Sequence, residues 1–321
     1  MPPGALVLHG FTGTPASVAG LADALAAAGF EVAAPLLPGH GGPVEEVIGT
    51  GWADWSAAAE AAYQELAARA SPVVVAGLSM GGALACQLAA DHAEIAGLIC
   101  VNPAVEPVAE SFFNILRGLL AAGVAVVPSG MGADVARPGG GETGPGGAPL
   151  APLVSMFEGV AGLAPRLGDV ACPLLLFTSV QDHVVAPSAS DLLADRVAGP
   201  VERVWLERSF HVATMDFEAE EIERRSARFA TEMTEPATWV VAGCLFEVSL
   251  PGSGWRWVGP SPAVTLVGED RRDGRHHFRF RAEAPGSAVL VYTGGYGGGG
   301  ERSLVVRIAP ESTGGAGGPP A

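Results

Sequence analysis

The sequence predicts an α/β fold with a doubly wound, mostly parallel sheet, a cap inserted into it, and a small all-β sandwich behind it. From residue 5 to about residue 230, short apolar runs alternate with longer alanine-rich segments, which is the pattern of βαβ units that feed a parallel sheet. After Glu235-Pro236 the alanine-rich segments end and a period of two begins, which is typical of half-buried antiparallel strands. We therefore expect an α/β domain over residues 1–234 and a β-sandwich over residues 236–310.

Each strand of the first domain is expected where an apolar run is bounded by turn residues. The expected strands are residues 5–8, 32–34, 73–76, 98–101, 174–178 and 204–206. Helical segments separate them, and each is stopped by glycine, proline or a polar cluster. The expected helices are residues 17–28, 52–69, 83–92, 188–197 and 218–233. Helices that connect parallel strands in this way cover both faces of the sheet.

The alternation of strand-like and helix-like segments is interrupted between residues 103 and 166, where we expect a cap insertion. Residues 110–120 and 153–163 are predicted to be helical. Residues 137–149 contain Gly-Gly-Gly and Gly-Pro-Gly-Gly and too few apolar side chains to order themselves, so a flexible loop is expected there. An insertion at this point would lie over the sheet as a lid.

In the sandwich, Phe278 and Phe280 face one way while Arg279 and Arg281 face the other, as in a strand with one buried face. Further strands are expected at residues 245–250, 263–267, 289–292 and 304–308, separated by Gly/Pro/Ser turns. A disordered tail is expected over residues 311–321.

Charge and composition exclude several classes of function. The formal charge of −16 repels phosphate backbones and anionic lipid surfaces, so we expect no nucleic-acid partner. No run reaches the roughly 18 apolar residues of a membrane span. Met1-Pro2-Pro3-Gly4 lacks the basic start of a signal peptide, so a cytoplasmic location is expected. The four cysteines lie far apart in apolar runs without a C-x-x-C pair, which indicates reduced core thiols and no metal site.

One motif carries the candidate nucleophile. Gly77-Leu78-Ser79-Met80-Gly81 follows the expected strand 73–76 and opens a helix, which is the context that a G-x-S-x-G nucleophile elbow requires. A serine on so tight a turn needs small neighbours two positions before and after it, and Gly77 and Gly81 provide them. The alternative is a glycine-rich turn with an incidental serine, which the partners found further along the chain disfavour.

An oxyanion hole is expected beside Ser79. His9-Gly10-Phe11-Thr12-Gly13 closes the first expected strand, where flanking glycines allow the amide of Phe11 to point at a developing oxyanion. The amide of Met80, the residue after the candidate nucleophile, is the expected second donor. His9 itself is expected to order the loop through hydrogen bonds.

The candidate acid and base follow later in the chain. Asp182 comes just after the expected strand 174–178, and His211 follows the expected strand 204–206 and precedes the closing helix. An aspartate in such a turn is explained equally well by local hydrogen bonding, but the chain order of serine, aspartate and histidine favours a catalytic triad. In a triad, Ser79 attacks an acyl carbon, His211 transfers the proton and Asp182 fixes the tautomer of His211.

With these motifs the chain resembles the carboxylesterase and monoacylglycerol-lipase-like branch of the α/β-hydrolase family. The matching stretches span the first domain: Leu8-His9-Gly10-Phe11-Thr12-Gly13-Thr14-Pro15, Leu37-Pro38-Gly39-His40-Gly41, Gly77-Leu78-Ser79-Met80-Gly81-Gly82, Gln181-Asp182-His183-Val184-Val185 and Ser209-Phe210-His211. The resemblance implies hydrolysis of short- to medium-chain acyl esters or monoacylglycerols through an acyl-enzyme, beneath a small cap and without a metal or organic cofactor. It also implies an acyl pocket lined by residues such as Phe112, Phe113, Leu116 and Met156, although residues at helical spacing are also typical of plain core.

Two alternatives stay open within this resemblance. Members of the family have further strand-forming sequence before the loop that here begins at His9, so the leading strands are expected to be missing or the start truncated. A thioesterase is the alternative within the enzyme class, because the same triad serves any activated acyl group.

The second domain resembles the chagasin-type inhibitors of papain-like cysteine proteases. Residues 250–257 stand where their first binding loop stands, and the strand order is kept through residues 268–280 and then 286–292. Their double-glycine loop is replaced by residues 268–272, however, and their Arg-Pro-Trp loop by Gly294-Gly295-Tyr296. The alternatives are therefore a protease-inhibitor-like binding protein in which this domain carries the main role, or a structural or oligomerising appendage.

Overall fold

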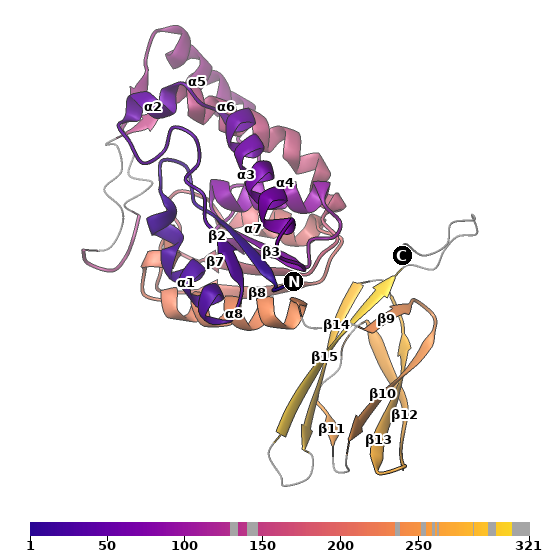
Figure 1. Cartoon of the computed structure of the whole chain (residues 1–321). Helices are drawn as coiled ribbons and strands as arrows, with labels where there is room; N and C mark the ends of the chain where they lie inside the picture. The colour runs from indigo at the N-terminus through magenta and orange to yellow at the C-terminus, as the bar shows by residue number, and fades with distance from the viewer. Residues whose placement is uncertain are drawn as a thin grey trace. The chain divides into compact units, whose positions relative to one another are not determined.

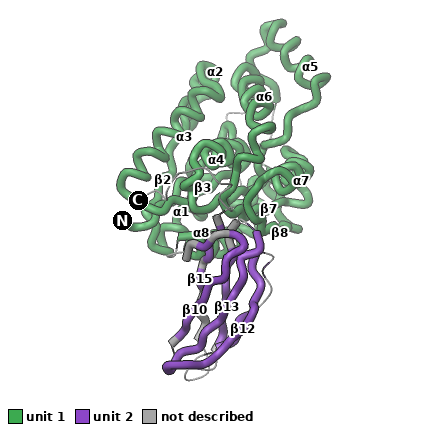
Figure 2. The backbone as a smooth tube through the Cα atoms, turned by 90° about the vertical axis from the view of Figure 1, so that its right-hand side faces the viewer, with its two compact units in different colours: residues 1–234 green, residues 235–321 purple. Residues whose placement is uncertain are grey.

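The computed structural model (Figure 1) describes residues 1–128, 134–139, 147–234, 238–251, 255–258, 261, 263–284, 286–294 and 300–309 of the chain. Contacts between residues divide the chain into two compact units, Met1–Thr234 and Glu235–Ala321 (Figure 2). The tail expected over residues 311–321 lies outside the described residues, as do residues 140–146 of the expected glycine-rich loop.

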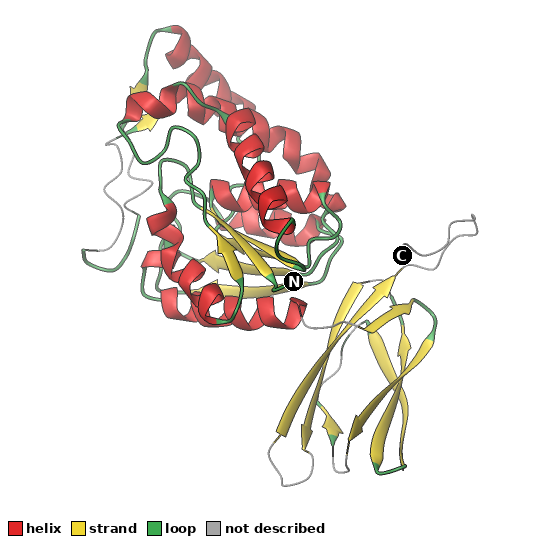
Figure 3. Ribbon diagram, viewed as in Figure 1, coloured by secondary structure: helices red, strands yellow, loops and turns green. Residues whose placement is uncertain are grey.

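The centre of the first unit is a six-stranded parallel sheet in the order β2-β1-β3-β4-β7-β8 (Figure 3). Its strands are β1 (Gly4–Leu8), β2 (Glu31–Ala33), β3 (Val73–Leu78), β4 (Gly97–Val101), β7 (Leu174–Ser179) and β8 (Val201–Leu206). The four central strands are buried along their whole length because helices cover both faces, which explains their uninterrupted apolar runs. The predicted doubly wound parallel sheet is confirmed.

The carboxyl ends of the parallel strands meet at one edge of the sheet. Leu8 pairs with Gly77, Leu78 pairs with Val101, and Val101 in turn pairs with Phe177. The loops after β1, β3, β4 and β7 therefore leave the sheet side by side, which is where open α/β sheets bind their ligands.

Helices pack on both faces of the sheet and form the cap. They are α1 (Ala19–Ala27), α2 (Val44–Ile48), α3 (Trp52–Ala67), α4 (Met80–Asp91), α5 (Glu110–Ala121), α6 (Leu150–Leu163), α7 (Pro187–Arg196) and α8 (Ala219–Thr234), with 3-10 turns at Pro15–Val18, Ala164–Asp169 and Ala213–Met215. α1 and α8 pack against each other on one face, and α3 and α4 cover the other (Figure 3). In α8, Ile222, Phe229 and Met233 lie on the buried side at helical spacing, whereas Arg224 and Arg228 are exposed.

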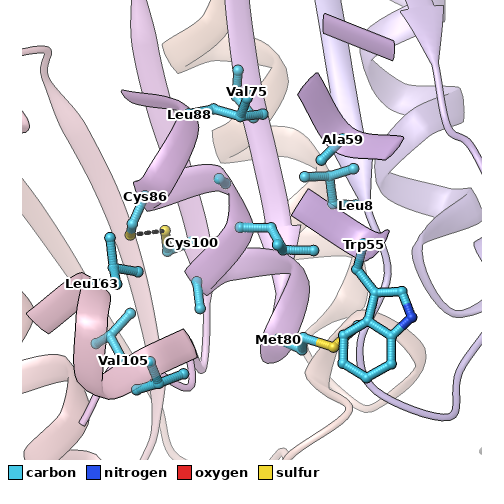
Figure 4. Packing of buried hydrophobic residues seen from close by; sticks show 14 of the residues in the cluster. Leu8, Trp55, Ala59, Val75, Met80, Cys86, Leu88, Cys100, Val105 and Leu163 are labelled. Carbon is cyan, nitrogen blue, oxygen red and sulfur yellow. Dashed lines mark hydrogen bonds between the residues drawn. The ribbon is translucent and has the colours of Figure 1, made fainter. Parts of the chain in front are cut away.

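Most of α4 is buried because it lies between the sheet and the helices α3 and α6. In Figure 4, Trp55 of α3 lies against Met80, and the Sγ atom of Cys86 lies 3.8 Å from the Sγ atom of Cys100 in β4. Complete burial raises the pKa of the Cys100 thiol well above its usual value, which keeps it protonated. The expectation that all four cysteines are core residues is wrong for Cys244, which is exposed.

The insertion after β4 contains α5 and α6, with a short antiparallel pair between them, β5 (Val126–Val127) and β6 (Ala148–Pro149). α6 is the inner helix and packs on α3 and α4, so its apolar residues from Leu150 to Leu163 are largely buried. α5 packs mainly on α6, and Leu116 is its buried residue. No helix among the described residues has both the length and the apolar character needed to cross a membrane.

The second unit consists of two small sheets that enclose an aromatic core. The sheets have the orders β10-β13-β12 and β11-β14-β15-β9. The strands are β9 (Thr238–Val241), β10 (Leu245–Pro251), β11 (Arg256–Trp257), β12 (Val264–Arg272), β13 (Arg275–Ala282), β14 (Gly286–Gly294) and β15 (Gly300–Ala309). Phe278 and Phe280 are buried beside Tyr292 while Arg279 and Arg281 are exposed, so the predicted alternation is confirmed. Every strand pair is antiparallel except β15 with β9 among the pairings described.

Candidate active site

Ser79 lies on the sharp turn between β3 and α4. Its backbone has φ +55° and ψ −117°, a strained conformation for a residue with a side chain. The turn closes so tightly that a Cβ atom on Gly77 would overlap the backbone of Gly81, and a Cβ atom on Gly81 would overlap the carbonyl of Leu8. Only glycine fits at either position. The turn holds Ser79 at the carboxyl edge of the sheet, with 9% of the residue exposed.

Asp182 and His211 form a hydrogen-bonded pair. Oδ2 of Asp182 lies 2.7 Å from Nδ1 of His211, and the two side chains are only 2% and 4% exposed. The other carboxylate oxygen accepts the N–H groups of Val184 and Val185, each at 2.8 Å, which fixes the plane of the carboxylate. Because a carboxylate can only accept, Nδ1 carries the proton and Nε2 is left as the basic nitrogen.

The main chain of His211 is held by a residue that the motifs did not indicate. Asn102, directly after β4, donates from Nδ2 to the carbonyl oxygen of His211 at 2.8 Å and to Oγ of Ser179 at 2.9 Å. Its Oδ1 accepts the N–H of Ser179 at 2.7 Å. Asn102 is buried, with φ +45°, and so joins β4 and β7 to the histidine loop. A polar residue directly after a buried strand was the signal that could have identified it.

The loop after β1 is ordered by a buried histidine. Nε2 of His9 accepts the N–H of Leu37 at 3.0 Å, so Nδ1 is the nitrogen that donates to the carbonyl of Gly10 at 2.9 Å. Burial lowers the pKa of His9 to about 4, against the opposing effect of the Gly10 hydrogen bond, so the ring is neutral near neutral pH. The loop lies close to the nucleophile, since a Cβ atom on Gly10 would be 3.4 Å from Cβ of Ser79.

The two expected oxyanion donors, Phe11 and Met80, directly follow Gly10 and Ser79 in the sequence. Phe11 is buried in the loop after β1, and Met80 is the first residue of α4, where the helix N-terminus favours negative charge. Within the described part of the chain, neither amide donates a hydrogen bond to another protein group. Both are therefore available to an oxyanion.

A pocket of about 90 Å³ brings the candidate residues together. Ser79, His211 and Phe11 all line it, and Met156 of α6 closes it from the cap. Its remaining wall is largely apolar and includes Leu153. The structure thus places the expected nucleophile, base and oxyanion loop around one space.

A larger cavity of about 890 Å³ adjoins this pocket and shares Leu153 and Phe157 of α6 with it. Phe112 of α5 lines the larger cavity, whereas Phe113 lines neither space and packs beneath the guanidinium of Arg117. The residues expected to form one acyl pocket are therefore divided: Met156 lines the pocket at Ser79, Phe112 and Leu116 line the larger cavity, and Phe113 lines neither.

No group of three or more histidine, cysteine, aspartate or glutamate side chains among the described residues is arranged to hold a metal ion. The polar groups at or next to the pocket include the hydroxyl of Ser79, the imidazole of His211 and the carboxylate of Asp182 bonded to it. This arrangement is suited to nucleophilic attack on a carbonyl carbon.

The sequence of this chain is similar to those of known hydrolases. A sequence profile described as serine aminopeptidase, S33, matches residues 4–130. The thermostable monoacylglycerol lipase of Bacillus sp. (strain H-257) is 37% identical over 230 residues, which are 71% of this chain and 90% of that lipase. The carboxylesterase of Bacillus subtilis (strain 168) is 39% identical over 84 residues, 26% of this chain and 34% of that enzyme.

Solved structures share the fold of the same part of the chain. One from work on LipS and LipT, two metagenome-derived lipolytic enzymes, superposes with a TM-score of 0.68 at 33% identity and covers 72% of this chain and 96% of its own. The monoacylglycerol lipase of Paleococcus ferrophilus superposes with a TM-score of 0.58 at 18% identity and covers 73% of this chain and 98% of its own.

Proposed function

Because this chain belongs to the α/β-hydrolase family and is a serine hydrolase similar to monoacylglycerol lipases and carboxylesterases, we propose that it cleaves esters of short- to medium-chain acyl groups, monoacylglycerols included. The observation that carries the proposal is the pairing of Asp182 with His211 beside a pocket that Ser79 also lines. In this proposal Ser79 is the nucleophile, His211 the general base and Asp182 the acid that orients it.

The proposed reaction proceeds through an acyl-enzyme. Ser79 Oγ attacks the acyl carbon while Nε2 of His211 takes its proton, and the carbonyl oxygen becomes an oxyanion between the amides of Phe11 and Met80. His211 then returns the proton to the leaving alkoxide. Water, activated by His211 in the same way, releases the acid and restores Ser79. Each preorganised amide lowers the barrier by about 3–4 kcal/mol.

The apolar walls of the two adjoining spaces support an aliphatic acyl group as substrate. The pocket at Ser79 is narrow, whereas the cavity beside it is wide and lined by apolar residues of α5 such as Phe112 and Leu116. Transfer of a hydrocarbon chain from water into an apolar cavity is favourable by about 0.8 kcal/mol of free energy per methylene. We therefore assign the acyl chain to the larger cavity.

The first test is a Ser79→Ala variant, assayed on p-nitrophenyl butyrate and on a monoacylglycerol. Loss of the nucleophile is expected to lower kcat by at least about 1,000-fold while the protein stays folded. The matched control is Ser56→Ala, which removes a hydroxyl from the outer part of α3 that bonds only to the carbonyl of Ala53 among the described contacts. Parental activity in the Ser79→Ala variant would rule out the proposed mechanism.

The second unit is proposed to be a separate β-sandwich domain. Residues 252–254 and 295–299, which belong to two of the loops that would carry protease inhibition, lie outside the described residues. A protein partner for this unit, and its likeness to chagasin-type inhibitors, stay predictions.

A further inference from the structure

A short piece of the cap insertion, residues 134–137, is hydrogen-bonded to the loop that follows β8. The N–H of Val212 donates to the carbonyl oxygen of Asp134 at 3.1 Å. Two N–H groups of the piece donate in turn to the fully buried carboxylate of Asp216, at 2.7 and 2.9 Å. The cap insertion and the loop that carries the candidate base are therefore joined at this point.

The side chain of Asp134 adds a second connection. Its Oδ2 accepts the backbone N–H of His211 at 3.1 Å, and its Oδ1 lies 2.8 Å from Nδ1 of His183. His183 directly follows Asp182, so one carboxylate contacts both the candidate base and the neighbour of the candidate acid. The Asp134 side chain is 14% exposed, which limits the competition from water for these bonds.

The peptide groups of His211 are held from two sides. Asp134 accepts its N–H, and Asn102 donates to its carbonyl oxygen. The direction of the imidazole depends on this backbone, because the ring has only two side-chain torsions with which to reach both Asp182 and Ser79. A displacement of the backbone by about 1 Å is enough to cost about 100-fold in rate.

Asp134 acts at a distance from the reacting atoms. It lines the larger cavity but not the pocket that contains Ser79. A direct effect on an acyl chain in the larger cavity is expected to change KM, whereas an effect that passes through His211 is expected to change kcat.

We propose that Asp134 is a positioning residue, which holds the main chain of His211 from within the cap insertion and so aligns the base with Ser79. The inference rests on the proposed triad and extends it. The cap insertion then supplies a support of the base as well as part of the wall of both cavities.

The test compares Asp134→Ala with Asp134→Asn on p-nitrophenyl butyrate. Asp134→Ala removes the acceptor and is expected to lower kcat by about 10- to 100-fold with KM little changed. Asp134→Asn keeps an oxygen that can accept the N–H of His211, so it is expected to recover most of the loss. Titration with a fluorophosphonate counts the competent active sites, so that kcat is expressed per site.

The number of titrated active sites distinguishes a positioning role of Asp134 from a purely structural one. A purely structural role would leave fewer competent sites, each with the parental kcat, and that result in Asp134→Ala would overturn the proposal. Glu158→Ala is the matched control, since Glu158 is a cap carboxylate that is 52% exposed and pairs with Arg117 at 2.7 Å, away from the histidine loop. It is expected to keep the parental kcat. An active Ser79→Ala variant would instead show that the proposed triad itself is wrong.

Discussion

At the scale of single residues, several polar groups at this site are held by backbone hydrogen bonds rather than by opposite charges. His9 is the clearest case, because its two ring nitrogens satisfy the N–H of Leu37 and the carbonyl of Gly10. A second proton on the ring would turn Nε2 into a donor that faces the N–H of Leu37. The loop that carries Phe11 therefore requires the neutral imidazole.

This requirement predicts acid sensitivity of a definite sign. Burial lowers the pKa of His9 from 6.5 to about 4, so between these values protonation favours the unfolded chain. The contribution of His9 to the free energy of unfolding is fully present above pH 6.5 and is lost as the pH falls through about 4. The free energy of unfolding of the parent is expected to fall more steeply over this interval than that of a His9→Gln variant, whose side chain does not titrate. Denaturant unfolding at a series of pH values measures both, and parallel curves would contradict the assignment.

At the scale of elements, α5 presents two neighbouring phenylalanines to different surroundings. Phe112 is 46% exposed and lines the larger cavity, whereas Phe113 packs towards the core under Arg117. Successive residues of a helix point about 100° apart, so neighbours in sequence rarely share one wall. The position on the helix therefore separates a residue that lines the cavity from one that packs.

The chain-length preference of the enzyme tests this distinction. Phe112→Ala is expected to lower kcat/KM for octanoate and decanoate esters by about fivefold relative to acetate, because the lost apolar contact is worth about 1 kcal/mol. Phe113→Ala serves as the matched control and is expected to lower the thermal stability without changing the ratio. Steady-state kinetics on a series of p-nitrophenyl esters measures the ratio, and an equal ratio in both variants would place the acyl chain elsewhere.

At the scale of the whole molecule, each unit has a hydrophobic core of its own. In the first unit, one cluster of buried residues lies between the parallel sheet and the helices α3, α4 and α6, and Phe278, Phe280 and Tyr292 belong to a separate cluster in the second. The proposed triad and both proposed oxyanion donors lie in the first unit. A unit with its own core and its own site is expected to fold and act without the other.

A chain truncated after Thr234 tests this independence. It is expected to keep kcat per titrated site and KM within about twofold of the full chain, because no proposed catalytic group is removed. Size-exclusion of both chains checks the alternative that the second unit is an oligomerising appendage. A truncated chain that folds but loses most of its kcat would mean that the second unit contributes to catalysis.

The sequence by itself determined the features that depend on neighbours along the chain. Apolar runs between helical segments predicted the parallel sheet, because strands buried on both faces must be apolar throughout. Gly77 and Gly81 around Ser79 predicted the strained turn, because no other residue fits there. The alternation around Phe278 predicted the half-buried strand β13 for the same kind of local reason.

Only the tertiary structure decided the contacts made across the chain. Asn102 and Asp134 support the two sides of the peptide at His211 from 109 and 77 positions away, and no local pattern marks them as its partners. The different surroundings of Phe112 and Phe113 likewise follow from which side of α5 packs on α6. The physical reason is that propensity and periodicity act over a few residues, whereas hydrogen bonds and packing join whatever side chains the closed fold brings together.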